Sequence, residues 1–201
     1  MRNSGFIGAL TLGLMACASG GDSPAAKAPE AAVAAKSVAP TVRSAPAATP
    51  QSGSTAPNVA LVSVEDGKVW NLQEGLDPEG TSSPKGYVLA FMASWCTYCT
   101  RSLPTLVQLE KDNPDLEIVT VSIDAGPEAQ QEELLKVRKF GLQGPVVAAD
   151  KATIDAWIGG GRSVPKYYFI DHNGTIVARD DGFGDKVEPM MAKQAARALR
   201  D

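Results

Sequence analysis

The sequence predicts an α/β fold, a mixed central β-sheet with helices on both of its faces. From about residue 58 onward, short apolar runs alternate with stretches of helical periodicity. The run 87–92 is continuously apolar, which is typical of a strand covered on both faces. The last elements form a hairpin and a helix, so the sheet cannot be wholly parallel.

The first predicted element is an N-terminal β-hairpin of strands 61–64 and 69–72, turned at Asp66-Gly67. After a loop rich in Pro and Gly comes the buried strand 87–92. A helix is expected from about Cys96 to Asp112, because leucines recur there at helical spacing and Asn113-Pro114 stops it.

The middle of the chain continues the alternation of strands and helices. A buried strand is expected at 117–123. A helix follows between Pro127 and Gly141, since Pro suits the first turn of a helix and Gly its C-terminal cap. A short strand at 146–148 and a short helix at 151–158 complete this part.

The predicted C-terminal elements are a second hairpin, 166–171 and 175–178 around Asn173-Gly174, and a closing helix. One face of that helix is marked by residues at i, i+3, i+4 and i+7 spacing. They are Val187, Met190, Met191, Gln194, Ala195, Ala198 and Leu199.

Composition divides the chain of 201 residues into unlike parts. Ala, Pro, Ser, Thr and Gly dominate the first 57 residues, whereas residues 58–201 carry the large apolar side chains and are long enough for one core. The net charge of −4 and the absence of a Lys/Arg cluster argue against nucleic acid as a partner. No apolar stretch reaches the length that a membrane-spanning helix needs.

Residues 1–16 are expected to be a signal peptide, because Arg2 is followed by the apolar run 6–16. Leu14-Met15-Ala16-Cys17 resembles the bacterial lipobox, which implies a lipidated Cys17 and stable membrane anchoring. Ordinary cleavage near Ala16-Cys17-Ala18 is the alternative and would discard Cys17. In the lipoprotein resemblance, Ala18 suits the outer membrane.

Residues 17–57 are expected to form a disordered linker that joins the lipidated cysteine to the folded domain. Many alanines interrupted by prolines can neither sustain a helix nor bury enough apolar surface. As a coil of roughly 40 residues the linker would reach about 35 Å.

Cys96 and Cys99 lie where a buried strand gives way to a helix. Unpaired N–H groups and the helix dipole at that end favour an anion, so the Cys96 thiolate is stabilised. Cys99 lies about one turn deeper and can form a disulfide with Cys96. Cys96 is therefore predicted to attack a partner sulfur and Cys99 to resolve the mixed disulfide.

Three other uses of the cysteine pair fit less well. A structural zinc site needs four ligands, and beside three cysteines the sequence offers only His172, in a predicted turn, so we expect no metal. A c-type haem site needs His directly after the second cysteine, where Thr100 stands. A static disulfide closing so small a ring would add little stability. No cofactor is expected.

The stretch Ala93 to Cys99 resembles the thioredoxin active site, and Leu103-Pro104 matches the proline that bends the first helix of that fold. Val164-Pro165 and the following segment 167–174 are similar to the TlpA/ResA-like branch of thioredoxin-fold proteins, which are periplasmic and held at a membrane. The resemblance covers about residues 59–200 and implies a thioredoxin-like fold.

The resemblance also implies roles for residues around the cysteines. Pro165 is expected to be cis, with the Val164 backbone pairing a substrate chain as an added strand. Trp95 is expected either at the lip of the site or in the core. Two carboxylates that assist the buried cysteine in the family are absent, because Ala90 and Ser102 stand at their positions.

The expected function is that of a periplasmic, membrane-tethered thiol–disulfide oxidoreductase that reduces protein cysteines. The resemblance implies apocytochrome c or metal-site cysteines as substrates, together with a membrane redox partner. A DsbA-like oxidase, a peroxidase and a non-catalytic binding module remain as alternatives.

Overall fold

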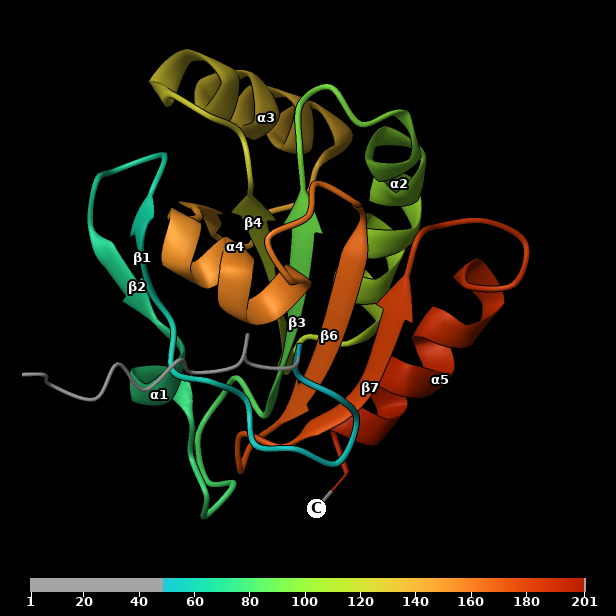
Figure 1. Cartoon of the computed structure of the whole chain (residues 1–201). Coiled ribbons are helices and arrows are strands. Elements are labelled where there is room, and N and C mark those ends of the chain that lie inside the picture. The colour runs from blue at the N-terminus through green and yellow to red at the C-terminus, as the bar shows by residue number, and fades with distance from the viewer. Residues whose placement is uncertain (1–48, 201) are drawn as a thin grey trace, which may run out of the picture. The chain divides into compact units, whose positions relative to one another are not determined.

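The computed structural model describes residues 49–200 and contains one seven-stranded mixed sheet with the order β2-β1-β5-β4-β3-β6-β7 (Figure 1). The central strands β3 (Gly86–Met92), β4 (Leu116–Ser122) and β5 (Val146–Ala148) run parallel. The outer strands of the sheet are antiparallel to their neighbours. They are β1 (Ala60–Ser63), β2 (Val69–Asn71), β6 (Lys166–Asp171) and β7 (Ile176–Asp181). This arrangement is a thioredoxin-like α/β fold, as predicted.

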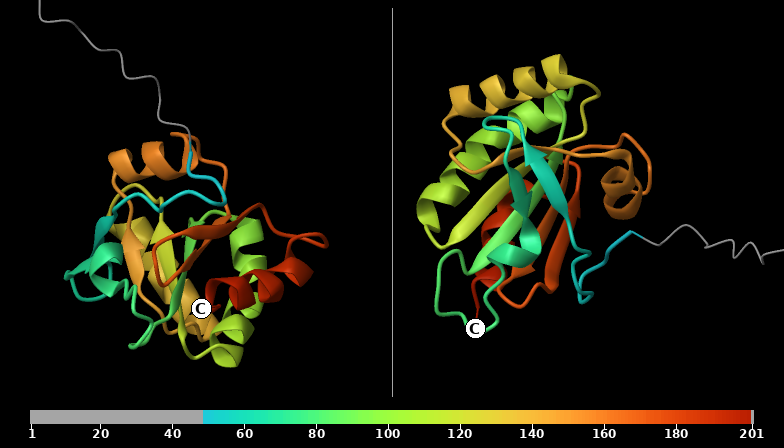
Figure 2. Two further views of the ribbon diagram at one scale, coloured as in Figure 1. Left: turned by 90° about the horizontal axis from the view of Figure 1, so that it is seen from below. Right: turned by 90° about the vertical axis from the view of Figure 1, so that its left-hand side faces the viewer.

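Helices cover both faces of the sheet (Figure 2). Helices α2 (Thr97–Asp112), α3 (Pro127–Phe140) and α5 (Glu188–Ala198) share one face, and α2 contacts both of the others. Helix α4 (Lys151–Ile158) lies on the opposite face. Its Trp157 packs against Phe91 and Tyr168 with ring centroids 5.8 and 5.0 Å away.

Local signals place the helix ends where the sequence predicts them. Pro127 opens α3, and Gly141 caps it in the left-handed conformation at φ 98°. Asp150 caps α4 by accepting the N–H of Thr153 at 2.7 Å, and Gly159 ends that helix in the same left-handed way. The short helix α1 (Leu72–Gly75), which directly follows β2, was not predicted.

The packed part of the chain begins earlier than predicted, which corrects the expectation of a linker reaching residue 57. Gly53 N–H donates to the Ile176 carbonyl at 2.7 Å, and Ala56 N–H to the Gly174 carbonyl at 2.8 Å. Ala56 is buried, so this segment docks on the hairpin of β6 and β7. The predicted signal peptide, the predicted lipidation site Cys17 and the remainder of the predicted linker up to residue 48 lie outside the described residues.

No helix among residues 49–200 is both long enough and apolar enough to span a bilayer.

Candidate redox site

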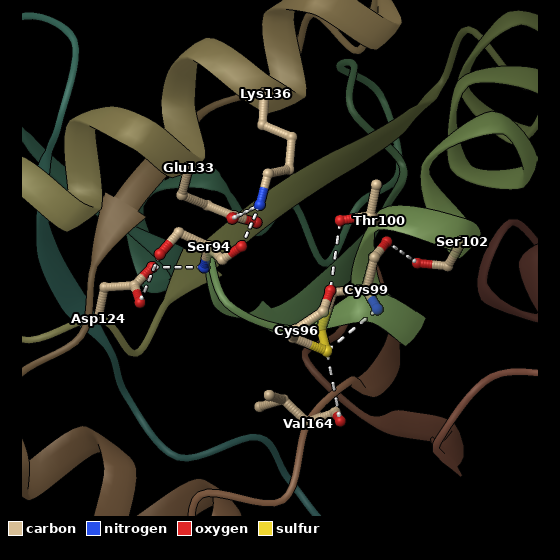
Figure 3. The surroundings of a disulfide bond; sticks show 9 residues. All are labelled: Ser94, Cys96, Cys99, Thr100, Ser102, Asp124, Glu133, Lys136 and Val164. Atoms are coloured by element: carbon tan, nitrogen blue, oxygen red, sulfur yellow. Dashed lines mark hydrogen bonds and ion pairs between the residues drawn. A yellow bond between two sulfur atoms is a disulfide. The ribbon is translucent and has the colours of Figure 1, made fainter.

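The two cysteines lie where the sequence places them, between the end of β3 and the start of α2 (Figure 3). Cys96 and Cys99 form a disulfide, with their Cα atoms 5.2 Å apart. Cys96 is the N-terminal cap of α2, and its Sγ accepts the N–H of Cys99 at 3.1 Å. A hydrogen bond at this position stabilises a thiolate on Cys96 when the disulfide is reduced.

The two sulfurs differ in accessibility in the direction that the predicted roles require. Cys96 is 6% exposed and Cys99 only 1%. Cys99 is buried in the first turn of α2, where its backbone carbonyl accepts a hydrogen bond from Ser102 Oγ at 2.8 Å. A partner sulfur therefore meets Cys96 first.

The loop before β6 lies against the disulfide from the other side. The Val164–Pro165 peptide is cis, as the resemblance implies. The Val164 carbonyl oxygen is 3.6 Å from Cys96 Sγ, a distance at which a Cys96 thiol could donate a weak hydrogen bond to it. Pro165 is buried and Val164 half-buried, so the backbone of Val164 borders the site.

Exposed aromatic side chains frame the opening of the site. Trp95 is 52% exposed and Tyr98 54%, which assigns Trp95 to the lip rather than the core. Arg162 lies over the Trp95 ring and Arg101 over the Tyr98 ring, each 5.4 Å from the ring centroid. These stacked pairs give the site a rim that is both cationic and aromatic.

The peptide groups of Ser94 are held from both sides by a buried aspartate and a half-buried lysine, which no local sequence pattern marks (Figure 3). Asp124 accepts the Ser94 N–H at 2.8 Å and the Ser94 hydroxyl at 3.1 Å. Lys136 Nζ donates to the Ser94 carbonyl and lies 3.8 Å from the carboxylate of Glu133. Together these contacts fix the loop that delivers Cys96 to the start of α2.

Glu133 is the most perturbed carboxyl group near the site. It is fully buried, neither of its oxygens has a hydrogen-bond partner within residues 49–200, and burial raises its pKa to about 7. Lys136 opposes that shift, and Asp124 and Glu132 add to it. A pKa near neutrality beside a reactive loop is typical of functional sites.

The part of the chain that the structure describes contains no set of side chains suited to binding a metal ion. No group of three or more His, Cys, Asp and Glu side chains there could hold an ion. His172 lies in the turn between β6 and β7, where its ring contacts the Asn173 side chain.

A family model described as AhpC/TSA matches residues 52–179, a range that contains the cysteine pair, the Ser94 loop and Val164-Pro165. The chain belongs to the AhpC/TSA family. The match extends through all of the strands except the last residues of β7.

A second comparison finds thioredoxin H5 of Oryza sativa subsp. japonica, 39% identical over 72 residues. These residues are 35% of this chain and 49% of the rice protein, so the chain spans about half the length of this curated relative.

Solved structures share the fold. A Chlorobium tepidum protein assigned as the thiol:disulfide interchange protein DsbE is 23% identical, with a TM-score of 0.61, over 76% of this chain and 100% of that one. A secreted disulfide oxidoreductase of Mycobacterium tuberculosis, homologous to E. coli DsbE, is 19% identical, with a TM-score of 0.52. That match covers 69% of this chain and 95% of the other. Identities this low support the fold alone.

Proposed function

We propose that this AhpC/TSA protein is a thiol–disulfide oxidoreductase that exchanges disulfides with cysteines of other proteins, acting as a reductase. The observation that carries the proposal is the position of Cys96. It caps α2, receives the Cys99 N–H on its sulfur and borders the Val164 backbone. This combination supplies an activated sulfur, a resolving sulfur and a place for a substrate chain.

The reaction needs only the two cysteines and a partner disulfide. The Cys96 thiolate attacks one partner sulfur, a mixed disulfide forms, and the other partner sulfur leaves with the electron pair and takes up a proton. The Cys99 thiolate then attacks Cys96 Sγ and releases the second partner sulfur. The partner gains two electrons and two protons, and the protein ends as the disulfide seen here.

The experiment that tests the activity is trapping of a partner. A Cys99→Ala variant should accumulate mixed disulfides with cellular proteins, because the resolving sulfur is missing. The matched Cys96→Ala variant should accumulate none, since Cys99 is buried. If neither variant forms mixed disulfides and Cys96→Ala retains the biological activity, the domain is a binding module whose disulfide is structural.

The site of action and the substrates rest on the resemblance to the TlpA/ResA-like branch. We place the protein in the periplasm, tethered through a lipidated Cys17 to a membrane, the outer membrane being favoured by Ala18. Apocytochrome c or metal-site cysteines are the proposed substrates, with electrons supplied by a membrane redox partner.

The anchor has a test of its own. Labelled palmitate should be incorporated into the wild type, and a Cys17→Ala variant should lose the label and leave the membrane fraction. An unlabelled wild type would eliminate the lipid anchor, while leaving the redox activity to be judged separately.

A further inference from the structure

Tyr167 lies between the two positions at which the family resemblance implies a carboxylate. Ala90, the first of these positions, is paired directly with Tyr167 across β3 and β6. Ser102, the second, lies near enough to the Tyr167 hydroxyl to lower the pKa of that group. Ser102 is itself bonded to the carbonyl of Cys99 at 2.8 Å (Figure 3). The phenol therefore lies close to the first turn of α2, which carries the resolving cysteine.

Tyr167 belongs to a row of side chains that crosses four neighbouring strands. Thr120 is paired with Ala90, Ala90 with Tyr167, and Tyr167 with Asp180. Phe91 and Tyr168, the next residues along β3 and β6, pack on Trp157 of α4.

Because neighbouring residues of a strand point to opposite faces, the row lies on the face of α2 and α5. Gln194 of α5 confirms this by donating to Asp180 Oδ1 at 3.1 Å.

The row contains buried polar atoms that are not satisfied by other protein groups. Within residues 49–200, three atoms of the row have no hydrogen-bond partner: Thr120 Oγ1, Tyr167 Oη and Asp180 Oδ2. The same holds for Oε1 of Gln194, the residue of α5 that is bonded to Asp180. Buried polar groups in native proteins are nearly always hydrogen-bonded, to protein or to ordered water. Ordered water can therefore link these free donors and acceptors to each other along the row.

The environment prepares two of these groups to handle a proton. Burial raises the pKa of Asp180. The hydrogen bond from Gln194 lowers this pKa in part, and the charge of Asp181 raises it further. Burial also raises the pKa of Tyr167; Ser102 lowers this pKa in part, and the charge of Asp180 raises it further. The phenol thus stays protonated and can only relay, whereas the Asp180 carboxylate is a stronger base than an ordinary aspartate. Oδ2 of Asp180 is buried, but the residue as a whole is half-buried in the edge strand β7, so the path from this carboxylate to solvent is short.

We propose that Tyr167 and Asp180 form the proton path of Cys99, taking the place of the carboxylates replaced by Ala90 and Ser102. The inference rests on the proposed oxidoreductase function and names the groups that serve its second step.

When Cys99 resolves a mixed disulfide, its thiol proton passes to the Tyr167 hydroxyl as the phenol proton passes to Asp180. The Cys99 thiolate attacks Cys96 Sγ, the Cys96–Cys99 bond forms, and the bond from Cys96 to the partner sulfur breaks. The partner sulfur leaves with the electron pair and is protonated by solvent. Both residues position a proton, and neither forms a bond to sulfur.

The test separates the two sulfur-transfer steps. A mixed disulfide between Cys96 and a chromogenic thiol is formed, and release of that thiol by Cys99 is followed from pH 5 to 9. In the wild type, release should reach its maximum at lower pH than in Tyr167→Phe or Asp180→Asn. At pH 6–7 both variants should be slower by on the order of a hundredfold, the usual size of a proton-transfer contribution. At high pH, where hydroxide removes the proton, the rates should converge.

Each variant has a matched control one residue further along its strand. Tyr168→Phe removes another buried phenol, one that donates to the Trp157 carbonyl on the opposite face of the sheet. Asp181→Asn removes an exposed carboxylate that pairs with Lys166 and Arg179. Tyr168→Phe should keep the wild-type pH profile, and Asp181→Asn should change it only slightly, because the Asp181 charge contributes less to the raised pKa of Asp180 than burial does. The first step, attack by Cys96, should be unchanged in all four variants.

The outcomes distinguish this inference from the proposed function. In one outcome, the wild type releases the thiol, and both Tyr167→Phe and Asp180→Asn follow the same pH profile as the controls. The proposed proton path is then wrong, whereas the proposed oxidoreductase function is retained. If the wild type neither forms nor resolves a mixed disulfide, the proposed function falls and the proton path falls with it.

Discussion

At the scale of single residues, the loop before Cys96 depends on charges that are costly to bury. Glu133 has no exposed surface, and its only ion-pair partner within residues 49–200 is Lys136, 3.8 Å away. Lys136 in turn donates to the Ser94 carbonyl. The contact of Lys136 with Ser94 holds the loop in place, but the carboxyl group of Glu133 beside it is buried, and burial favours its protonated form.

A Glu133→Gln variant tests this balance through the pH dependence of stability. In the folded protein the pKa of Glu133 is raised from 4.5 to about 7. Such a group stabilises the fold fully below pH 4.5, and that contribution is lost as the pH rises toward 7. At 1.36 kcal/mol for each pKa unit, the loss is roughly 3 kcal/mol.

We therefore expect the wild type to lose up to about 3 kcal/mol more than Glu133→Gln between pH 4.5 and 8, measured as the free energy of unfolding in urea. Glu128→Gln is the matched control and should follow the wild type, because Glu128 is an exposed carboxylate of the same helix and is not among the groups that shift the pKa of Glu133. Parallel curves for the wild type and Glu133→Gln would show that the pKa of Glu133 keeps its ordinary value of 4.5 in the folded protein.

Part of the site can be predicted from the sequence because its residues are close together or belong to a motif. Cys96 and Cys99 lie three residues apart at the start of one helix, and the cis Pro165 follows from the family resemblance. Asp124 and Lys136 escape prediction, since they reach Ser94 from 30 and 42 residues away without a shared pattern. Tyr167 is predictable only as part of a strand, because the groups that surround its hydroxyl come from the two neighbouring strands, which pair Tyr167 with Ala90 and Asp180.

At the scale of elements, boundaries were predictable wherever a cap or a helix-breaking residue marks them. Helix α4 was predicted at 151–158 and begins and ends there, because Asp150 caps its start and Gly159 its end. Strand β5 also has its predicted bounds. These signals act over a few residues, so they are visible without knowledge of the tertiary structure.

The elements that were missed depend on contacts between distant parts of the chain. Strand β7 was expected to end at residue 178 but continues to Asp181, paired with Lys166 at the start of β6. Thr55 forms a bridge with Thr175, which draws the end of the expected linker onto the domain. Nothing in the local composition of residues 50–57 distinguishes them from the Ala- and Pro-rich chain before them.

At the scale of the whole molecule, two segments that the sheet brings together act in opposite directions on the stability of the Cys96 thiolate. The start of α2 and the Cys99 N–H favour a Cys96 thiolate. From the other side, the Val164 carbonyl presents its negative end 3.6 Å from the same sulfur and can accept a hydrogen bond from a thiol. Strong oxidants of the thioredoxin fold owe their potential to a heavily stabilised reduced state. Here the carbonyl limits how far the thiolate is stabilised.

This balance predicts a reduction potential for the Cys96–Cys99 pair nearer to about −270 mV than to about −120 mV, the values typical of thioredoxin and of a strong oxidase. The two values differ by about 7 kcal/mol in the free energy of the disulfide, at 1.4 kcal/mol for each 30 mV, so the measurement discriminates clearly. The oxidised fraction can be followed by thiol alkylation after equilibration in dithiol buffers of graded potential. A value close to −120 mV would mean that stabilisation of the thiolate outweighs the Val164 carbonyl, and electrons would then flow from substrate cysteines to the protein.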